Sequence, residues 1–526
     1  MPSHVDEDAP EDAPLLDDDE RHDEPLPTWP RIRARSWQAK TPGSIVLLAA
    51  AVMFCVTSSG MLMLIPLYRL IEDALCHAHY ADSSHTIIDE MQCKGDEVQS
   101  RLAYVLGWFG LFNSIMTLLV SFPFALLADR IGRKPTALMA YGGTALSFCF
   151  APFMLGKMQA SVRNNPYLLM IGSLFLLLGG GVPTLLATVY AMAADVSSEQ
   201  ETAASFLYLS FGSTAGALIG PMLAGLLMEK YGPWIPVYVV LAVTPAILCI
   251  FFFIPETLVA RPGTPSKAQL VDIKELVGSG LRDLGRSLEL VKNTNILLVL
   301  VLFLFQNARF TAYTSTLTQY ISKNFGWKFS ETSILLSPLG ILNLAVLAAL
   351  PRASQVLMSR RFRSTVFGTD LFLTQASTLL NLVGALVQGL SSNASVFIMG
   401  LFIGTFGSAD SPLARATVSH HVDAEHTTRL YALIGMVEVL GSFFGGPALA
   451  RLFDFGLQRK GVWTGLPWFY VALLCAASLV ALLFVEPPGA KLYTDHGLSQ
   501  SDEDEVSSPA ANSATEIHVL RRVPGG

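Results

Sequence analysis

Five ionisable residues interrupt long apolar segments in the second half of this 526-residue chain: Arg309, Asp370, Asp410, Arg415 and Glu438. An ionised group at the centre of such a segment costs roughly 3 kcal/mol or more unless it is paired or faces water. A carboxylate there can bind a proton from one side and release it to the other, with a proton affinity set by burial and by a neighbouring guanidinium. These residues are therefore candidates for proton transfer within a membrane.

Two of the acids are expected at matching depth. Asp410 and Glu438 each lie about eight residues, or about 12 Å, from the end of their segments that is expected to face the cytoplasm. Asp370 lies only a few residues from a segment end, beside Arg363, where a gate or a structural salt bridge is the better explanation. Arg415 is expected to extend towards water. The alternative for all of them is an ion-pair network that only locks helices together.

Uncharged polar residues offer a second, weaker set of candidates. They could contact a solute in mid-membrane, or they could make helix-to-helix hydrogen bonds. They are Thr57, Ser58, Ser59, Asn113, Tyr190, Gln306 and Asn307.

The segments that carry these residues are long enough to span a membrane. About 20 apolar residues cross a bilayer core of about 30 Å. The chain is 52% hydrophobic and only 15% charged, against roughly 25% charged residues in soluble domains. We therefore expect an all-α polytopic membrane protein with 12 transmembrane helices. The predicted spans lie near 44–66, 102–128, 135–156, 166–194, 203–228 and 233–255, and near 295–317, 332–350, 365–390, 394–418, 430–453 and 464–486.

The spacing of these spans divides the chain into five parts. They are an acidic disordered tail (1–42), a first six-helix bundle (43–257), a linker (258–293), a second six-helix bundle (294–487) and a second disordered tail (488–526). Both tails are too polar to fold. Apolar residues recur at helical spacing in the linker, which favours an interfacial amphipathic helix over a merely solvated connection.

Basic residues predict the orientation. They are more frequent in the segment before the first span, in the linker and in the loops that follow spans two and eight than in the alternate loops. Both termini are therefore expected in the cytoplasm, and the polar loop 68–101 on the outer or luminal side.

That loop contains Cys76 and Cys93, and two thiols in one oxidising loop indicate a disulfide. Two unpaired thiols are the alternative, and a metal site with the nearby histidines is a weaker one. Asn393 begins the only Asn-x-Ser/Thr sequon and falls on the same side, although its closeness to the membrane disfavours glycosylation.

Two motifs carry a family resemblance. Between spans two and three stands Ala125-Leu-Leu-Ala-Asp129-Arg130-Ile-Gly132-Arg133-Lys134. It resembles the loop 2–3 signature of the major facilitator superfamily, in which Gly usually stands where this chain has Ala125. Span five contains Gly216-x-x-x-Gly220-Pro221-x-x-Ala224-Gly225, which resembles the antiporter motif of the same superfamily with Ala224 in place of a Gly.

The resemblance implies two six-helix bundles related by an axis along the membrane normal. An echo of span five in span eleven, Gly441-Ser-Phe-Phe-Gly445-Gly446-Pro447, agrees with this repeat. In this family, spans seven and ten line the cavity, which favours Arg309 and Asp410. Asp129 would belong to a conformational latch, with Asp195 nearby. The span-five motif would be a hinge that limits proton leak, or ordinary small-residue packing.

Finer similarity is found in two further stretches, Gln319-Tyr-Ile-Ser-Lys323 with Gly326-Trp327, and Trp463-Thr-Gly-Leu-Pro467. They look like a group of fungal members without assigned substrates. That group is distantly similar to the proton-coupled folate transporter type, which shares Asp129-x-x-Gly132-Arg133-Lys134.

The sequence therefore predicts a secondary transporter, expected to be monomeric, with a small solute, protons and the bilayer as partners. Proton-coupled efflux is favoured, uptake by symport is the alternative, and a transporter-like receptor is the alternative from another class. No hydrolase, zinc or phosphate-loop motif indicates an enzyme, a metal or a cofactor. No basic stripe indicates nucleic acid.

A sorting signal is also expected. Glu11-Asp-Ala-Pro-Leu15-Leu16 fits the acidic dileucine pattern that sorting adaptors recognise on the cytoplasmic face. It would direct the protein to the vacuole or endosomes, whereas a merely solvated tail would leave the plasma membrane as the destination.

Overall fold

A computed structural model describes residues 35–81, 84, 86–197, 199–258, 291–358, 365–422 and 427–487. Within these ranges, 12 helical segments are long and apolar enough to cross a membrane. The predicted tails, the amphipathic linker helix and the motif Glu11-Leu15-Leu16 lie outside the described residues, as do the side chains of Asp129 and Arg130.

The first six spans form the amino-terminal half. Its elements are α1 (Pro42–Tyr80), the 3₁₀-helix η1 (Glu90–Lys94), α2 (Asp96–Ile131), α3 (Arg133–Lys157), α4 (Gln159–Asn164), the 3₁₀-helix η2 (Pro166–Leu178), α5 (Gly181–Val196), α6 (Glu199–Tyr231) and α7 (Trp234–Phe253).

The last six spans form the carboxy-terminal half. Its elements are α9 (Thr294–Thr311), the π-helix η4 (Ala312–Thr316), α10 (Leu317–Phe325), α11 (Phe329–Leu357), α12 (Val366–Leu390), α13 (Ala394–Phe406), α14 (Asp410–Ser419), α15 (Thr427–Leu440), the 3₁₀-helices η6 (Gly441–Phe444) and η7 (Gly461–Gly465), α16 (Gly446–Arg459) and α17 (Leu466–Leu483).

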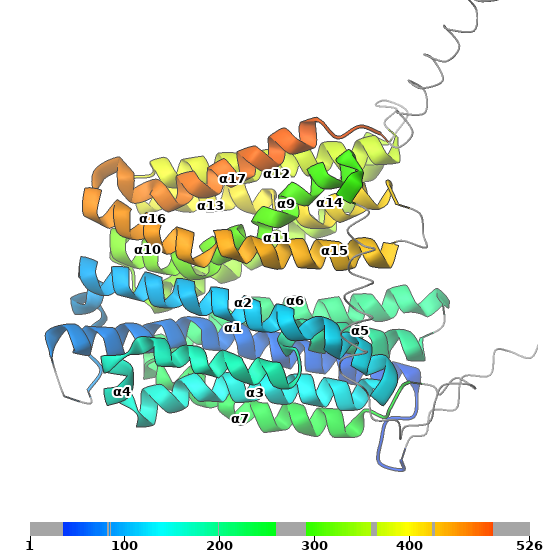
Figure 1. Ribbon diagram of the computed structural model, residues 1–526, viewed down its shortest axis with the longest axis horizontal. Coiled ribbons are helices and arrows are strands. Elements are labelled where there is room, and N and C mark those ends of the chain that lie inside the picture. The colour runs from blue at the N-terminus through cyan, green and yellow to red at the C-terminus, as the bar shows by residue number, and fades with distance from the viewer. Residues whose placement is uncertain are drawn as a thin grey trace, which may run out of the picture.

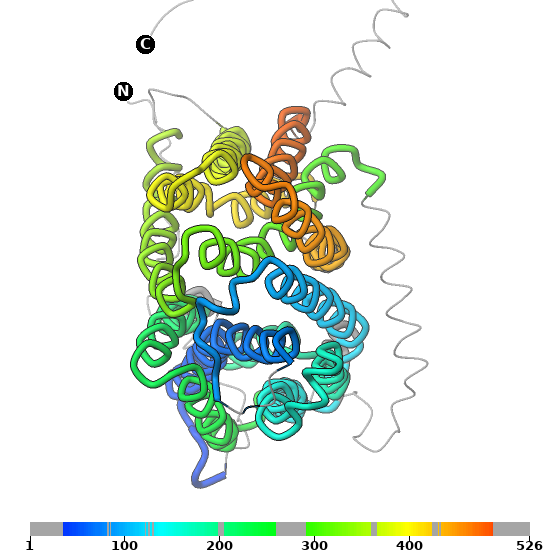
Figure 2. Tube along the Cα trace, turned by 90° about the vertical axis from the view of Figure 1, so that its left-hand side faces the viewer, coloured from blue at the N-terminus to red at the C-terminus, as the bar shows by residue number. Residues whose placement is uncertain are grey.

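The two halves lie side by side with their helices roughly parallel (Figure 1), and the view along the helices shows them as two separate groups (Figure 2). Buried apolar side chains of the described residues form two clusters centred on each half, and Phe329 and Ala103 each join a cluster of the opposite half. We call the end that contains Cys76 and Cys93 the disulfide end, and the end that contains Gly132 the hinge end. Helix α1 begins and α17 finishes at the hinge end (Figure 1).

The glycine motifs of spans five and eleven occupy equivalent positions. A Cβ on Gly216 of α6 would lie 2.6 Å from the carbonyl oxygen of Phe54 in α1. A Cβ on Gly441 would lie 1.8 Å from the carbonyl oxygen of Leu304 in α9. Span five therefore packs backbone to backbone on span one, and span eleven packs in the same way on span seven, as small residues permit in a membrane.

The other glycines of these motifs hold the two halves together. A Cβ on Gly225 would lie 2.7 Å from the carbonyl oxygen of Ser330 in α11, and one on Gly446 would lie 2.2 Å from that of Gly107 in α2. Ser333 of α11 donates a hydrogen bond of 2.6 Å to the carbonyl oxygen of Pro221.

Helix α1 is longer than the sequence predicts. We expected a span at 44–66 and a loop from residue 68, but the helix continues to Tyr80. The amino-terminal half also carries buried charges, because Arg69 and Glu72 lie on this extension with 3% and 0% of their surface exposed. Their mutual pairing at 3.2 Å offsets the cost of burial.

Candidate functional site

The carboxy-terminal half contains a buried ion pair in the middle of the bundle. Arg309 of α9 donates through Nη1 to the carboxylate oxygen Oδ2 of Asp410 at the start of α14. The two residues are only 7% and 5% exposed. Burying two charges costs several kcal/mol per ion, and close contact with extra hydrogen bonds is what offsets this cost.

Further donors surround the Asp410 carboxylate. Asn381 of α12 donates through Nδ2 to Oδ2 at 3.2 Å, and the backbone N–H of Ser411 donates to Oδ1 at 2.8 Å. The Nδ2 of Asn381 is also 2.9 Å from the carbonyl oxygen of Gly407. The sequence analysis missed Asn381, because an amide inside an apolar span gives no charge signal.

The break between α13 and α14 positions Asp410. Helix α13 ends at Phe406, and Asp410 is the first residue of α14. A helix N-terminus carries unpaired N–H groups and a partial positive charge, so a carboxylate is stabilised there. A Cβ on Gly407 would lie 2.3 Å from the carbonyl oxygen of Ser377, so the break requires a residue without a side chain.

A second ion pair lies on neighbouring elements. Arg415 of α14 donates through Nη2 to Oε1 of Glu438 in α15, and its guanidinium lies 5.1 Å from the ring centroid of Phe303. The two side chains are 35% and 23% exposed, so this pair is more accessible than the first. Arg415 therefore pairs with an acid of a neighbouring helix while its side chain stays 35% exposed.

Irregular backbone adjoins both pairs. The π-helix η4 begins three residues after Arg309, and π-helical turns are frequent at functional sites. Glu438 lies just before η6, where span eleven is broken. Asn307 satisfies part of this break, because its Nδ2 donates at 2.8 Å both to the carbonyl oxygen of Glu438 and to Oγ of Ser442.

The uncharged candidates divide into two groups. Thr57 hydrogen-bonds Ser213 at 3.1 Å and Tyr190 hydrogen-bonds Ser210 at 3.0 Å, so these two join helices. In the described part of the chain, by contrast, the amide oxygens of Asn113 and Gln306 have no hydrogen-bond partner. These two remain candidates for solute contact.

The Asp370 carboxylate pairs with a histidine. Its Oδ2 lies 3.1 Å from Nε2 of His420 at the hinge end, whereas Arg363, its expected neighbour, is outside the described residues.

The loop 2–3 motif at the hinge end contacts an acid that the motif itself does not include. Glu256, which follows α7, accepts from the backbone N–H groups of Arg133 at 2.8 Å and Lys134 at 3.2 Å. It thereby caps the N-terminus of α3, a position that favours a carboxylate. The φ of Gly132 is +114°, which explains the glycine at this position.

The charged side chains of the loop 2–3 motif bind partners within the amino-terminal half. Nε of Arg133 lies 3.2 Å from Oδ2 of Asp195, and Nζ of Lys134 donates to the carbonyl oxygen of Ile254 at 2.6 Å. The structure thus brings Arg133 and Asp195 together, on elements other than those of the Arg309–Asp410 pair.

The disulfide end has its own polar cluster. Cys76 and Cys93 form a disulfide with their Cα atoms 5.4 Å apart. Asn393 is exposed between α12 and α13 at this end. In the part of the chain that the structure describes, no three His, Cys, Asp or Glu side chains gather to hold a metal ion.

Comparisons with known proteins agree on the class. The model of the Major Facilitator Superfamily matches residues 101–374. The MFS efflux pump atnC of Emericella nidulans is 27% identical over 491 residues, which cover 91% of this chain and 93% of that protein. The efflux pump ustT of Aspergillus flavus is 25% identical over 456 residues, with 83% and 87% covered.

Two solved structures share the fold. The human organic anion transporter MFSD10 superposes with a TM-score of 0.54 at 15% identity, covering 85% of this chain and 99% of that one. A D-xylose-proton symporter superposes with a TM-score of 0.60 at 11% identity, covering 85% and 98%.

The fold and the family model define a membrane transporter, and the chain belongs to the Major Facilitator Superfamily. It is a multi-pass integral membrane protein with relatives among fungal efflux pumps.

Proposed function

We propose that this transporter exports a small organic solute in exchange for protons by alternating access. The observation that carries the proposal is the presence of two carboxylate–guanidinium pairs, Arg309–Asp410 and Arg415–Glu438, beside helix breaks in one half. The direction of transport is suggested by the relatives that are named efflux pumps.

The pairs couple protonation to structure. A proton that binds Asp410 removes the negative charge that stabilises the buried Arg309 guanidinium. Breaking one side of a buried pair costs about 3–5 kcal/mol, so the protonated state favours a different arrangement of α9 and α14. The guanidinium then needs a new partner, and a polar or anionic group of the solute is the chemistry that fits it.

The second pair suits proton exchange with water. The Glu438 side chain is 23% exposed, against 7% for Asp410. A proton arriving from water therefore reaches Glu438 more readily than Asp410. Arg415 belongs to the same helix as Asp410, so a change at Glu438 is transmitted to Asp410 through α14.

Orientation is part of the proposal. We assign the hinge end, where the basic motif lies, to the cytoplasm. The interhalf contacts of Gly225, Ser333 and Gly446 would then lie on the side away from the cytoplasm, which supports a state open towards the cytoplasm. In that state, the Asp410 and Glu438 region would receive solute from the cytoplasm.

The test uses purified protein in proteoliposomes. A compound is first selected from a metabolite and drug library by the thermal stabilisation that it gives the protein. Asp410→Asn and Glu438→Gln should abolish concentration of this compound by an imposed pH gradient, while exchange of compound across the membrane survives. Asp370→Asn is the matched control, since this acid of the same half pairs with His420 and should be dispensable. If both neutral variants still concentrate the compound, the proposal is wrong.

A further inference from the structure

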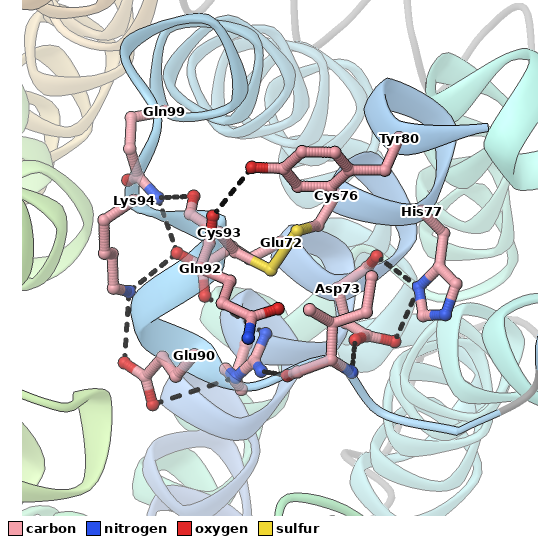
Figure 3. The surroundings of a disulfide bond; sticks show 12 residues. Glu72, Asp73, Cys76, His77, Tyr80, Glu90, Gln92, Cys93, Lys94 and Gln99 are labelled. Carbon is pink, nitrogen blue, oxygen red and sulfur yellow. Dashed lines mark hydrogen bonds and ion pairs between the residues drawn. A yellow bond between two sulfur atoms is a disulfide. The ribbon is translucent and has the colours of Figure 1, made fainter. Parts of the chain in front are cut away.

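A nearly buried network of four charged residues lies beside the disulfide (Figure 3). Glu72 of α1 is fully buried and accepts from Nζ of Lys94 at 2.7 Å and from Nη1 of Arg69 at 3.2 Å. Glu90 lies 3.1 Å from Lys94 and 3.7 Å from Arg69. Two acids thus balance two bases, and the sequence analysis had placed all four residues in a loop.

The disulfide joins the two elements that carry this network, α1 and η1. Cys93 stands on η1 between Glu90 and Lys94, and its bond to Cys76 ties η1 to α1. Gln99 at the start of α2 adds two hydrogen bonds, one of 3.1 Å to the carbonyl oxygen of Cys93 and one of 2.5 Å to Glu72. Segment 90–96 is therefore held rigidly on the amino-terminal half.

The same segment also binds the carboxy-terminal half. Oε1 of Glu90 accepts at 2.7 Å from the backbone N–H of Phe329, the first residue of α11. Nζ of Lys94 lies 3.9 Å from the centroid of the Phe329 ring. Lys323 of α10 donates to the carbonyl oxygen of Lys94 and pairs with Asp96 at 2.6 Å.

These contacts between the halves can break without leaving an uncompensated buried charge. When α11 moves away, Glu90 loses the positive end of a helix but keeps Lys94 and Arg69. Lys323 is only partly buried, so water can replace its partners. A contact of this kind stabilises one state of a transporter and still allows its release.

We propose that residues 90–96, stapled to α1 by Cys76–Cys93, form a latch that holds the disulfide end closed and is released in every transport cycle. This disulfide-end latch rests on the alternating-access part of the proposed function. It is independent of proton coupling and of the identity of the solute. Glu90 and Lys323 act as positioning residues, because they set the equilibrium between states and touch no solute.

The test measures the distance between the two halves without substrate. Spin labels are attached to cysteines placed at Lys157 of α3 and Asn324 of α10, in a background where the four free cysteines are replaced and the disulfide is kept. Both positions are exposed at the disulfide end. Double electron–electron resonance then reports the populations of closed and open states.

Glu90→Ala should raise the ratio of open to closed molecules on the order of tenfold, because a charge-assisted hydrogen bond to a helix N-terminus is lost. Glu90→Asp should restore part of the closed population. Lys323→Ala should act in the same direction from the other half, without touching the buried network. Glu97→Ala is the matched control, since Glu97 is exposed and its two partners, Arg101 of α2 and His79 of α1, both belong to the amino-terminal half.

The disulfide is tested in the same way. Joint replacement of Cys76 and Cys93 by Ala should broaden the distance distribution and raise the open population, because η1 is then tied to α1 only by the charged network. Distance distributions for Glu90→Ala and Lys323→Ala that match the parent protein would overturn the proposal, even if proton-coupled export is confirmed. A shifted equilibrium in a protein that fails to couple protons would support the latch and refute only the antiport.

Discussion

At the scale of single residues, the candidate site depends on which arginine pairs with which acid. Arg309 and Asp410 were identified from the sequence because ionisable residues are rare in apolar spans. Their partnership was not predictable, since either arginine could have reached either acid. Their positions on α14 determine the pairing. Asp410, on the first turn, pairs with Arg309 of α9, whereas Arg415, one turn later, pairs with Glu438 of α15.

Residues that support the ion pairs and the loop 2–3 motif gave no sequence signal. Asn381 is one amide among many, and Glu256 is an acid at the end of the predicted first bundle, just after span six. Only the packing of α12 against α14, and of the segment after α7 against α3, gives them their roles.

A double-mutant cycle tests the buried pair as a stabilising unit. Arg309→Met should lower the free energy of unfolding by about 3–5 kcal/mol, because Asp410 then remains charged and unpaired. Adding Asp410→Leu to this variant should recover most of the loss, since no buried charge remains. Thermal unfolding in detergent measures both changes. A double-variant change equal to the sum of the changes for Arg309→Met and Asp410→Leu alone would mean that the two residues do not interact.

At the scale of elements, the spans were predictable and their interruptions were not. Uninterrupted apolar runs set the number of helices, because each backbone group in lipid must be satisfied within its own helix. The π-helix η4 and the breaks at Gly407 and η6 depend instead on contacts between spans. The same applies to the end of α1, where partners for Arg69 and Glu72 extend the helix into a predicted loop.

A pair of glycine substitutions tests the packing of span eleven on span seven. Gly441→Ala should destabilise the protein by about 1–3 kcal/mol, because the new methyl group would overlap the carbonyl oxygen of Leu304. Gly435→Ala is the control on the same span, where a Cβ meets nothing within 4 Å. It should be neutral or stabilising by up to about 1 kcal/mol, since Ala favours the helix. Thermal stability in detergent is the measurement, and equal effects of the two substitutions would contradict the close contact.

At the scale of the whole molecule, the repeat of six spans was predicted from the motifs, and the fold confirms it. The echo between spans five and eleven corresponds to equivalent packing on spans one and seven. The conformation of the transporter was not predictable, because one sequence adopts every conformation of the alternating cycle and a structure shows one of them. The contacts of Glu90, Lys323 and Ser333 join the two halves, and in our proposal they mark the closed end.

Orientation in the membrane can be tested by labelling two exposed positions. Lys157→Cys at the disulfide end and Arg35→Cys at the hinge end are each introduced into a background without other free thiols. On intact cells with the protein at the plasma membrane, an impermeant maleimide should label only Lys157→Cys, because the basic hinge end is assigned to the cytoplasm. Arg35→Cys should react only after permeabilisation. The reverse pattern would invert the proposed topology and the direction of transport.

The most direct measurement of the central claim is the pH inside sealed proteoliposomes when only a substrate gradient is imposed. Vesicles are loaded with the stabilising compound and a pH-sensitive dye, and are then diluted into compound-free buffer at the same pH with the membrane potential clamped. Proton-coupled antiport predicts that the interior acidifies as the compound leaves, and that Asp410→Asn or Glu438→Gln abolishes this change. An interior that becomes alkaline would establish symport instead, and efflux of the compound with no change in pH would contradict proton coupling altogether.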